Sequence, residues 1–113
     1  MDKIEWLPLG TVVTITGGIQ KLIIVGRGLS IKLVKEEEPY YFDYSGVLYP
    51  IGAQGDDILY FNHDKVDQVL FKGYDDDDNR IINNCIDRFL ADHPNIRRYV
   101  AVRTIAPQDE GEK

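Results

Sequence analysis

The 113-residue sequence contains a single cysteine, Cys85, and this scarcity excludes an internal disulfide and a zinc site built from several cysteines. Long apolar runs are also missing. The longest are short, such as LIIV at 22–25, whereas a membrane-spanning helix needs about 18 apolar residues. The first ten residues lack a basic segment followed by a long apolar core, so no secretory signal is expected. We therefore expect a cytoplasmic protein with no membrane-inserted segment.

Positive charge is scarce as well. The sequence has 13 lysines and arginines against 19 aspartates and glutamates, which gives a formal net charge of −6. Binding to duplex nucleic acid depends on neutralising phosphates with basic side chains, and the basic residues here are scattered apart from Arg97 and Arg98. The composition argues against a nucleic-acid partner and is compatible with a basic or apolar protein partner.

The sequence does have the hydrophobic content of a globular protein, at 43% of its residues. A chain of this length is long enough to bury one core but not two. We expect a single globular domain over residues 1–106, followed by a flexible acidic tail at 107–113.

Short apolar runs punctuated by glycine and proline predict most of the secondary structure. Gly17-Gly18 between two such runs is typical of a hairpin, and Gly46 within a strand predicts a bulge or a close backbone approach. Pro94 predicts the end of a helix near His93. The expected elements are strands at 9–16, 21–28 with an extension through Leu33, 40–50, 58–62, 68–74 and 97–105, one helical turn capped by Asn62 or Asp64, and a helix at about 76–92.

This pattern predicts an α+β fold: a strongly bent, mostly antiparallel sheet of five to six strands with one main helix, about 76–92, packed on it. The apolar residues of the helix recur at helical spacing and are expected to face the sheet. They are Ile81, Ile82, Cys85, Ile86, Phe89 and Leu90. On that face Cys85 would be a buried, unreactive thiol.

Four consecutive aspartates, 75–78, precede the predicted helix and first suggest a metal site. An EF-hand calcium loop requires glycine at position 6 and glutamate at position 12, but counting from Asp75 these are Arg80 and Ile86. A helix start explains the run better, since one aspartate caps the free amides, with Asp78 as a candidate, and the others lie near the positive end of the helix dipole. The sequence leaves open the possibility that these aspartates bind a cation weakly.

The sequence contains no recognisable catalytic or metal-binding set. His63 and His93 stand alone, whereas a zinc site needs three or four ligands. The serines, Ser30 and Ser45, lie in no Gly-x-Ser-x-Gly motif, and the glycines at 17–28 lack the Gly-Lys-Ser/Thr ending of a phosphate loop. We expect no enzyme activity, no cofactor and no resident metal.

Aromatic residues are concentrated between 40 and 74. Because strand side chains alternate between faces, about half of them should fill the core and leave several tyrosines partly exposed. Exposed Tyr and Trp are typical interface anchors. The candidates for protein binding are Trp6, Tyr40, Tyr44, Tyr49 and Tyr60. A tyrosine-rich sheet without a partner fits the pattern equally well, and a partner could also pair with an edge strand.

Several short motifs are spread over the first two thirds of the sequence. They are Leu7-Pro8-Leu9-Gly10, Gly17-Gly18, Gly26-Arg27, Tyr44-Ser45-Gly46, Tyr49-Pro50, Phe61-Asn62 and Phe71-Lys72-Gly73-Tyr74. With these motifs the sequence resembles a family of small Firmicutes proteins known only as a domain of unknown function, and the similarity covers roughly residues 7–74. The aspartate run and the acidic tail do not belong to the recognised pattern.

Members of that family tend to be encoded beside LXG-type toxins exported by the type VII secretion system. The resemblance implies a cytoplasmic chaperone or targeting adaptor that binds such a toxin, or a component of the secretion system, as a monomer or weak dimer. Asp75, Asp76 and Asp77 are then candidates for docking a basic partner. An immunity protein, in which Asp75–Asp78 mimic an anionic substrate, is one alternative. A small carboxylate-dependent enzyme or a cation-binding regulator is another.

Overall fold

The computed structural model describes residues 4–32, 38–55, 57–98 and 103–104. The expected tail at 107–113 lies outside these residues, as do 99–102 and 105 of the strand expected at 97–105. The elements are β1 (Val12–Ile15), β2 (Lys21–Ile31), β3 (Tyr40–Tyr49), β4 (Leu59–Phe61), the 3₁₀ turn η1 (His63–Lys65), β5 (Val66–Phe71), α1 (Asp77–Asp92) and β6 (Arg103–Thr104).

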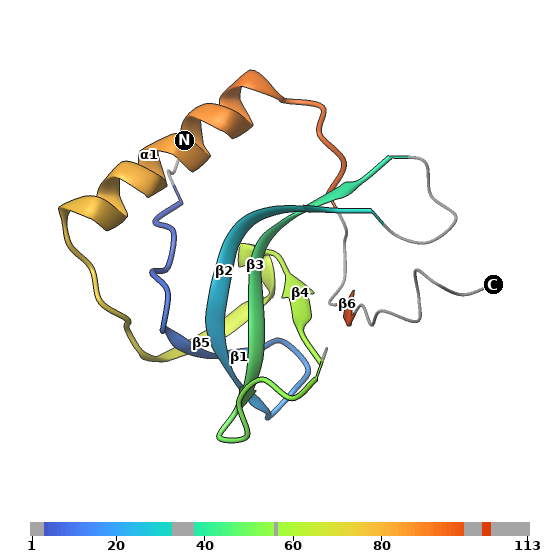
Figure 1. Ribbon diagram of the computed structural model, residues 1–113, viewed down its shortest axis with the longest axis vertical. Helices are drawn as coiled ribbons and strands as arrows, with labels where there is room; N and C mark the ends of the chain where they lie inside the picture. The colour runs from blue at the N-terminus through green and yellow to red at the C-terminus, as the bar shows by residue number, and fades with distance from the viewer. Residues whose placement is uncertain (1–3, 33–37, 56, 99–102, 105–113) are drawn as a thin grey trace.

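The strands form one sheet in the order β5-β1-β2-β3-β4-β6, and each neighbouring pair is antiparallel (Figure 1). The β1–β2 hairpin turns at Gly17-Gly18 as predicted, and Gly17 has φ 86°, which an L side chain rarely adopts. With α1 as its main helix, the chain has the predicted α+β fold.

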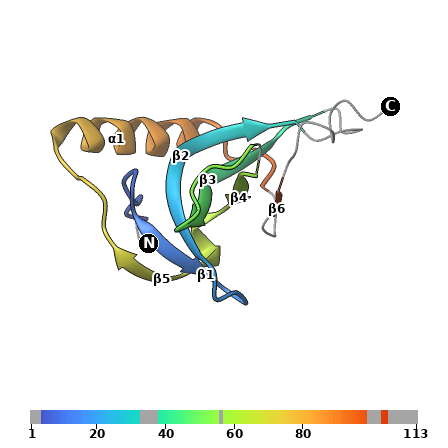
Figure 2. The same ribbon diagram turned by 60° about the horizontal axis from the view of Figure 1, so that its bottom comes forward.

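The two longest strands, β2 and β3, curve together and bend the sheet (Figure 2). Their register shifts at Val25, an extra residue in β2, and such a bulge increases local twist and bending. A Cβ on Gly46 of β3 would lie only 3.0 Å from the carbonyl oxygen of Ile23 and 3.2 Å from the ring of Phe61. The close approach predicted at Gly46 is confirmed, whereas the extra residue lies in the neighbouring strand.

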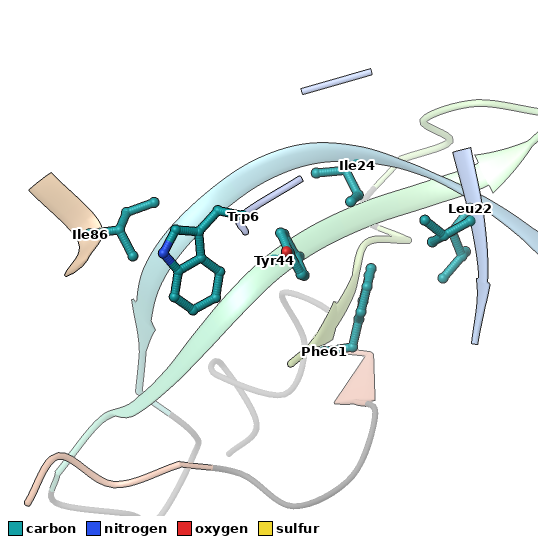
Figure 3. Close-up of a cluster of buried hydrophobic side chains, with 7 residues drawn as sticks. Trp6, Leu22, Ile24, Tyr44, Phe61 and Ile86 are labelled. Atoms are coloured by element: carbon teal, nitrogen blue, oxygen red, sulfur yellow. The ribbon is translucent and has the colours of Figure 1, made fainter. Parts of the chain in front are cut away.

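The hydrophobic core contains one or two side chains from each of β1, β2, β3, β4 and α1, together with Trp6. Figure 3 shows Trp6, from the segment before β1, lying between Ile86 of α1 and Tyr44 of β3. The N-terminal segment thus fills the space between the helix and the sheet. The buried cluster consists of Trp6, Val13, Leu22, Ile24, Tyr44, Phe61 and Ile86.

Helix α1 begins and ends as predicted, but most of its apolar stripe is not buried. Ile86 is buried and Leu90 packs partly against the core. The expectation that the whole stripe is buried against the sheet is wrong. Ile81, Ile82 and Cys85 are exposed, and Phe89 is also exposed, although its ring stacks on Tyr41 of β3. The reason is geometric: α1 lies against Trp6 and one end of the curved β2–β3 pair, so only a narrow line of side chains reaches the core (Figure 2).

The helical turn predicted between β4 and β5 is present as η1, and Asn62 precedes it. The side chain of Asn62 does not cap η1 but accepts a hydrogen bond from the backbone N–H of Asp43 at 2.9 Å. No helix in the described part of the chain is long and apolar enough to cross a membrane.

The contact between Gly73 and the segment before β1 gives a test of this packing. A Cβ on Gly73 would lie 2.0 Å from the carbonyl oxygen of Leu9, so Gly73→Ala should lower the free energy of unfolding by about 2–3 kcal/mol, or more. Gly18→Ala is the matched control because its Cβ would lie 3.7 Å from the nearest atom, and it should change stability by less than about 1 kcal/mol. Urea unfolding followed by Trp6 fluorescence measures both. Equal stability of the two variants would contradict the Leu9–Gly73 contact.

Candidate functional site

Two of the predicted anchors lie inside the protein. Trp6 is 4% exposed and its indole N–H donates to Oδ1 of Asp87 at 2.7 Å, while Tyr44 is fully buried. The expectation that Trp6 is exposed is therefore wrong, and Tyr44 presents no surface either. The residues before β1 have no strand or helix periodicity, so no pattern in them indicates that this segment folds back onto the core.

The other three tyrosines do not form one surface patch. Tyr40 is half-buried beneath the guanidinium of Arg97, 4.0 Å from the ring centroid. Tyr60 is half-buried against Phe42, and Tyr49 is 45% exposed. Tyr40 and Tyr49 are the first and last residues of β3, separated by about 30 Å measured along the strand. A partner contacting all three would have to span the whole sheet.

Tyr44, His63 and the N-terminal segment meet in a hydrogen-bonded cluster. The Tyr44 hydroxyl accepts from the backbone N–H of Leu7 at 3.1 Å and lies 2.7 Å from Nδ1 of His63. We assign the hydroxyl proton to the bond with Nδ1, which makes His63 neutral with its own proton on Nε2. Burial raises the pKa of Tyr44 and lowers the pKa of His63, so both groups are neutral near pH 7.

Asp43 is a buried carboxylate whose oxygens are both engaged. The backbone N–H of His63 donates to Oδ2 at 2.8 Å, and the Arg98 guanidinium contacts Oδ1. Burial raises the pKa of Asp43, while these two contacts oppose that rise. Without them a buried charge would be strongly unfavourable. Asp43 therefore fastens the turn after β4 and the chain after α1 to β3.

The aspartate run starts α1, as the helix-start interpretation predicted. Asp76 is the N-cap, and its Oδ1 accepts a hydrogen bond from the backbone N–H of Asn79 at 3.1 Å. The cap is thus Asp76 and not Asp78, which lies in the first helical turn. An N-cap side chain satisfies one of the amides that the helix leaves without an acceptor.

The neighbouring aspartates are engaged locally. Asp75 accepts from the side-chain amide of Asn79 at 2.8 Å and lies 3.4 Å from Nζ of Lys72, and these contacts lower the pKa of Asp75. Asp77 pairs with Arg80 one turn later. In the described residues, no three His, Cys, Asp or Glu side chains converge to hold a metal ion.

The side of α1 that faces the core is surprisingly polar. Every third or fourth residue lies on one line of a helix, and we call the line turned toward the core the inner seam. Its two asparagines form hydrogen bonds, Asn79 with Asp75 and Asn83 with Arg27 at 2.9 Å. The inner seam consists of Asn79, Asn83, Ile86 and Leu90.

The adjacent line of α1, the outer seam, is more apolar and is exposed. Ile82 is 47% exposed, Phe89 is 38% exposed, and Cys85 is also accessible. Ile81, at 59% exposure, lies beside them. The sequence does contain a signal for this exposed line. The six apolar residues of α1 occur in adjacent pairs, so they form a stripe that is wider than the face a helix packs against a core. The outer seam runs Asp78, Ile82, Cys85, Phe89 and Asp92.

A shallow cleft of about 370 Å³ lies between the outer seam and the far end of β2 and β3. Cys85 and Phe89 line one side, and Tyr41, whose ring stacks on Phe89 with centroids 5.6 Å apart, lines the other. Gly28 also lines it, with φ 63° and no side chain to fill the space. The cleft is large enough to take one large apolar side chain.

The edge strand β5 exposes a second set of apolar side chains. Val69, Leu70 and Phe71 are 48%, 47% and 63% exposed, and Tyr74 just beyond them is 81% exposed. The pairing of β5 with β1 contains two register shifts, and Asp67 lies in the strand. Bulges and charges of this kind protect an edge against addition of another strand. Contact through side chains therefore suits β5 better than the edge pairing considered from the sequence.

A family model described as "Domain of unknown function (DUF4176)" matches residues 6–82. The chain belongs to this family. The match extends beyond the expected 7–74 and includes the aspartate run and the first part of α1. Neither curated proteins nor solved structures gave a match. The family description names no function.

The cap assignment gives a prediction for the aspartates of this DUF4176 chain. Asp76→Ala should lower the free energy of unfolding by about 1 kcal/mol, because an amide of the first helical turn loses its acceptor. Asp77→Ala is the control, since its exposed pair with Arg80 is worth about 0.5 kcal/mol or less. Urea unfolding compares the two. A larger loss of unfolding free energy for Asp77→Ala than for Asp76→Ala would contradict the assignment of Asp76 as the cap.

His63 should make stability depend on pH. Its pKa is lowered in the folded chain, so the unfolded chain takes up a proton first and the free energy of unfolding should fall as pH drops below about 6.5. His63→Asn keeps an acceptor for Tyr44 and does not titrate. The stability of the unmodified chain relative to this variant should therefore decrease from pH 7 to pH 5, with Asp43 present in both. Parallel stability curves would contradict the assignment of a neutral His63.

Proposed function

We propose that this chain is a non-enzymatic binding protein, a cytoplasmic chaperone or targeting adaptor that holds a type VII secreted toxin before export. The observation that carries the proposal is the apolar surface that the described chain leaves uncovered on α1 and β5. Of the six apolar residues in the stripe of α1, Ile86 is buried, Leu90 is half-buried and the other four are exposed.

Apolar side chains grouped on a surface commonly mark a site of protein association. Covering a half-exposed isoleucine or phenylalanine contributes about 1 kcal/mol, so either group of side chains, on α1 or on β5, can contribute several kcal/mol to a contact with a partner. The acidic charge of the chain, −6 overall, favours a partner with a basic surface and accelerates their encounter.

The toxin as partner comes from the family resemblance, and the geometry favours an adaptor over an immunity protein. Mimicry of an anionic substrate needs carboxylates directed at the toxin. Asp75 and Asp76 instead bond to Asn79, and Asp77 pairs with Arg80. The uncovered apolar side chains have no role in such mimicry, but they suit the holding of a partner before export.

Co-expression tests the proposal. The chain and the toxin expected to be encoded beside it are produced together without the secretion system, and the tagged toxin is purified. We expect the chain to elute with the toxin as a complex on size-exclusion chromatography, and export from the native host to fall when the chain's gene is deleted.

An unrelated exported toxin serves as the control and should recover none of the chain. A growth assay separates the two roles, because an adaptor leaves an intoxicated cell unprotected. Protection of the cell would replace the adaptor by an immunity protein. Absence of a complex with the neighbouring toxin would sink the proposal.

A further inference from the structure

We infer that the outer seam of α1 is the docking site for a single amphipathic helix of the partner, one that carries basic residues at both ends of its apolar stripe. The inference rests on the proposed binding function and specifies the surface and the chemistry of that contact.

The spacing of the outer seam is that of a helix-pairing surface. Its residues 78, 82, 85, 89 and 92 are separated by four, three, four and three positions, the alternation found in two-helix coiled coils. Residues 78–92 span about 21 Å at the rise of an α-helix, enough for roughly four turns of a partner helix. The three central positions, Ile82, Cys85 and Phe89, are the apolar ones.

The cleft beside the seam supplies a recess for the partner. It is lined by Cys85 and Phe89 of the seam on one side and by Gly28 and Tyr41 on the other. A helix lying along the seam would bring one large apolar side chain over this recess, the arrangement of a knob entering a hole. Phe89 is held by its stacking on Tyr41, so the wall of the recess is already in place.

Charge decides which helix fits. The apolar part of the seam is bounded by Asp78 at one end and Asp92 at the other, both exposed. In a second copy of α1 packed antiparallel, Asp78 would meet Asp92, and packed parallel each would meet its own counterpart. Both arrangements oppose carboxylates, between chains of net charge −6. A foreign helix with Lys or Arg at these ends converts the repulsions into attractions.

Stapled helical peptides test the inference without knowledge of the partner. One peptide of about 16 residues carries leucines at the seam spacing with lysines at both ends, and a second replaces those lysines by glutamates. The readout is the rate at which Cys85, the sole cysteine, reacts with a disulfide reagent in the native full-length chain. We expect the lysine peptide at saturation to slow this reaction at least about tenfold, and the glutamate peptide to bind about tenfold more weakly.

Substitutions identify the surface. Ile82→Lys should weaken binding of the lysine peptide at least about tenfold. Ile19→Lys, the same change at a 95% exposed position in the β1–β2 turn, should leave the affinity for this peptide unchanged. Asp78→Asn combined with Asp92→Asn should remove the preference for lysine over glutamate. Circular dichroism verifies that each variant folds.

Three results would overturn the inference. In the first, neither peptide protects Cys85. In the second, both bind equally and Ile82→Lys has no effect. In the third, Cys85 becomes protected with rising protein concentration alone, which would assign the seam to a second copy of the chain.

The toxin complex separates failure of this inference from failure of the proposed function. If the toxin co-purifies equally with Ile82→Lys and Ile19→Lys, and Cys85 reacts freely in the complex, the adaptor function stands and the seam is not its site. If no toxin co-purifies, the peptides still decide whether the seam binds a basic amphipathic helix.

Discussion

The burial of Tyr44 is the constraint on which the rest of the structure depends. Its ring lies in the core against Trp6 and Phe61, with centroids 6.4 Å and 5.6 Å away. A hydroxyl buried at that depth must find hydrogen-bond partners, and it finds them in the backbone of Leu7 and the ring of His63. The N-terminal segment, the central strand β3 and the turn after β4 are thereby tied to one point.

The attachment of α1 follows from that arrangement. With the N-terminal segment fixed, Trp6 lies under the helix and its indole bonds to Asp87. Arg27 connects the carbonyl of Leu7 with Asn83 of the helix. Hydrogen bonds, the buried Ile86 and the stacking of Phe89 on Tyr41 therefore hold α1 in place, and most of the more apolar line of the helix stays exposed.

Much of the fold could be predicted because its signals are local. The Gly17-Gly18 turn, the restriction at Gly46 and the helix between the aspartates and Pro94 each depend on the conformational limits of a few adjacent residues. The candidate site was harder to predict from the sequence. Helical spacing showed that six residues of α1 are apolar, but it could not show which of two adjacent lines meets the core. The aromatic residues were identified as important, yet Trp6 and Tyr44 turned out to hold the interior together.

By itself, the sequence determined the order and type of the elements, the start of α1 at the aspartate run and the acidic character of the surface, because these depend on backbone preference and charge. Only the tertiary structure decided that Asp76 is the cap, that Trp6 is buried and that Cys85 is exposed. The cap is a local contact between Asp76 and Asn79, and the run of four aspartates left several candidates for it. The outcomes for Trp6 and Cys85 depend on the path of the N-terminal segment and on the curvature of β2 and β3, which bring together residues as far apart as Trp6 and Asp87. Contacts of such long range leave no periodic trace in the chain.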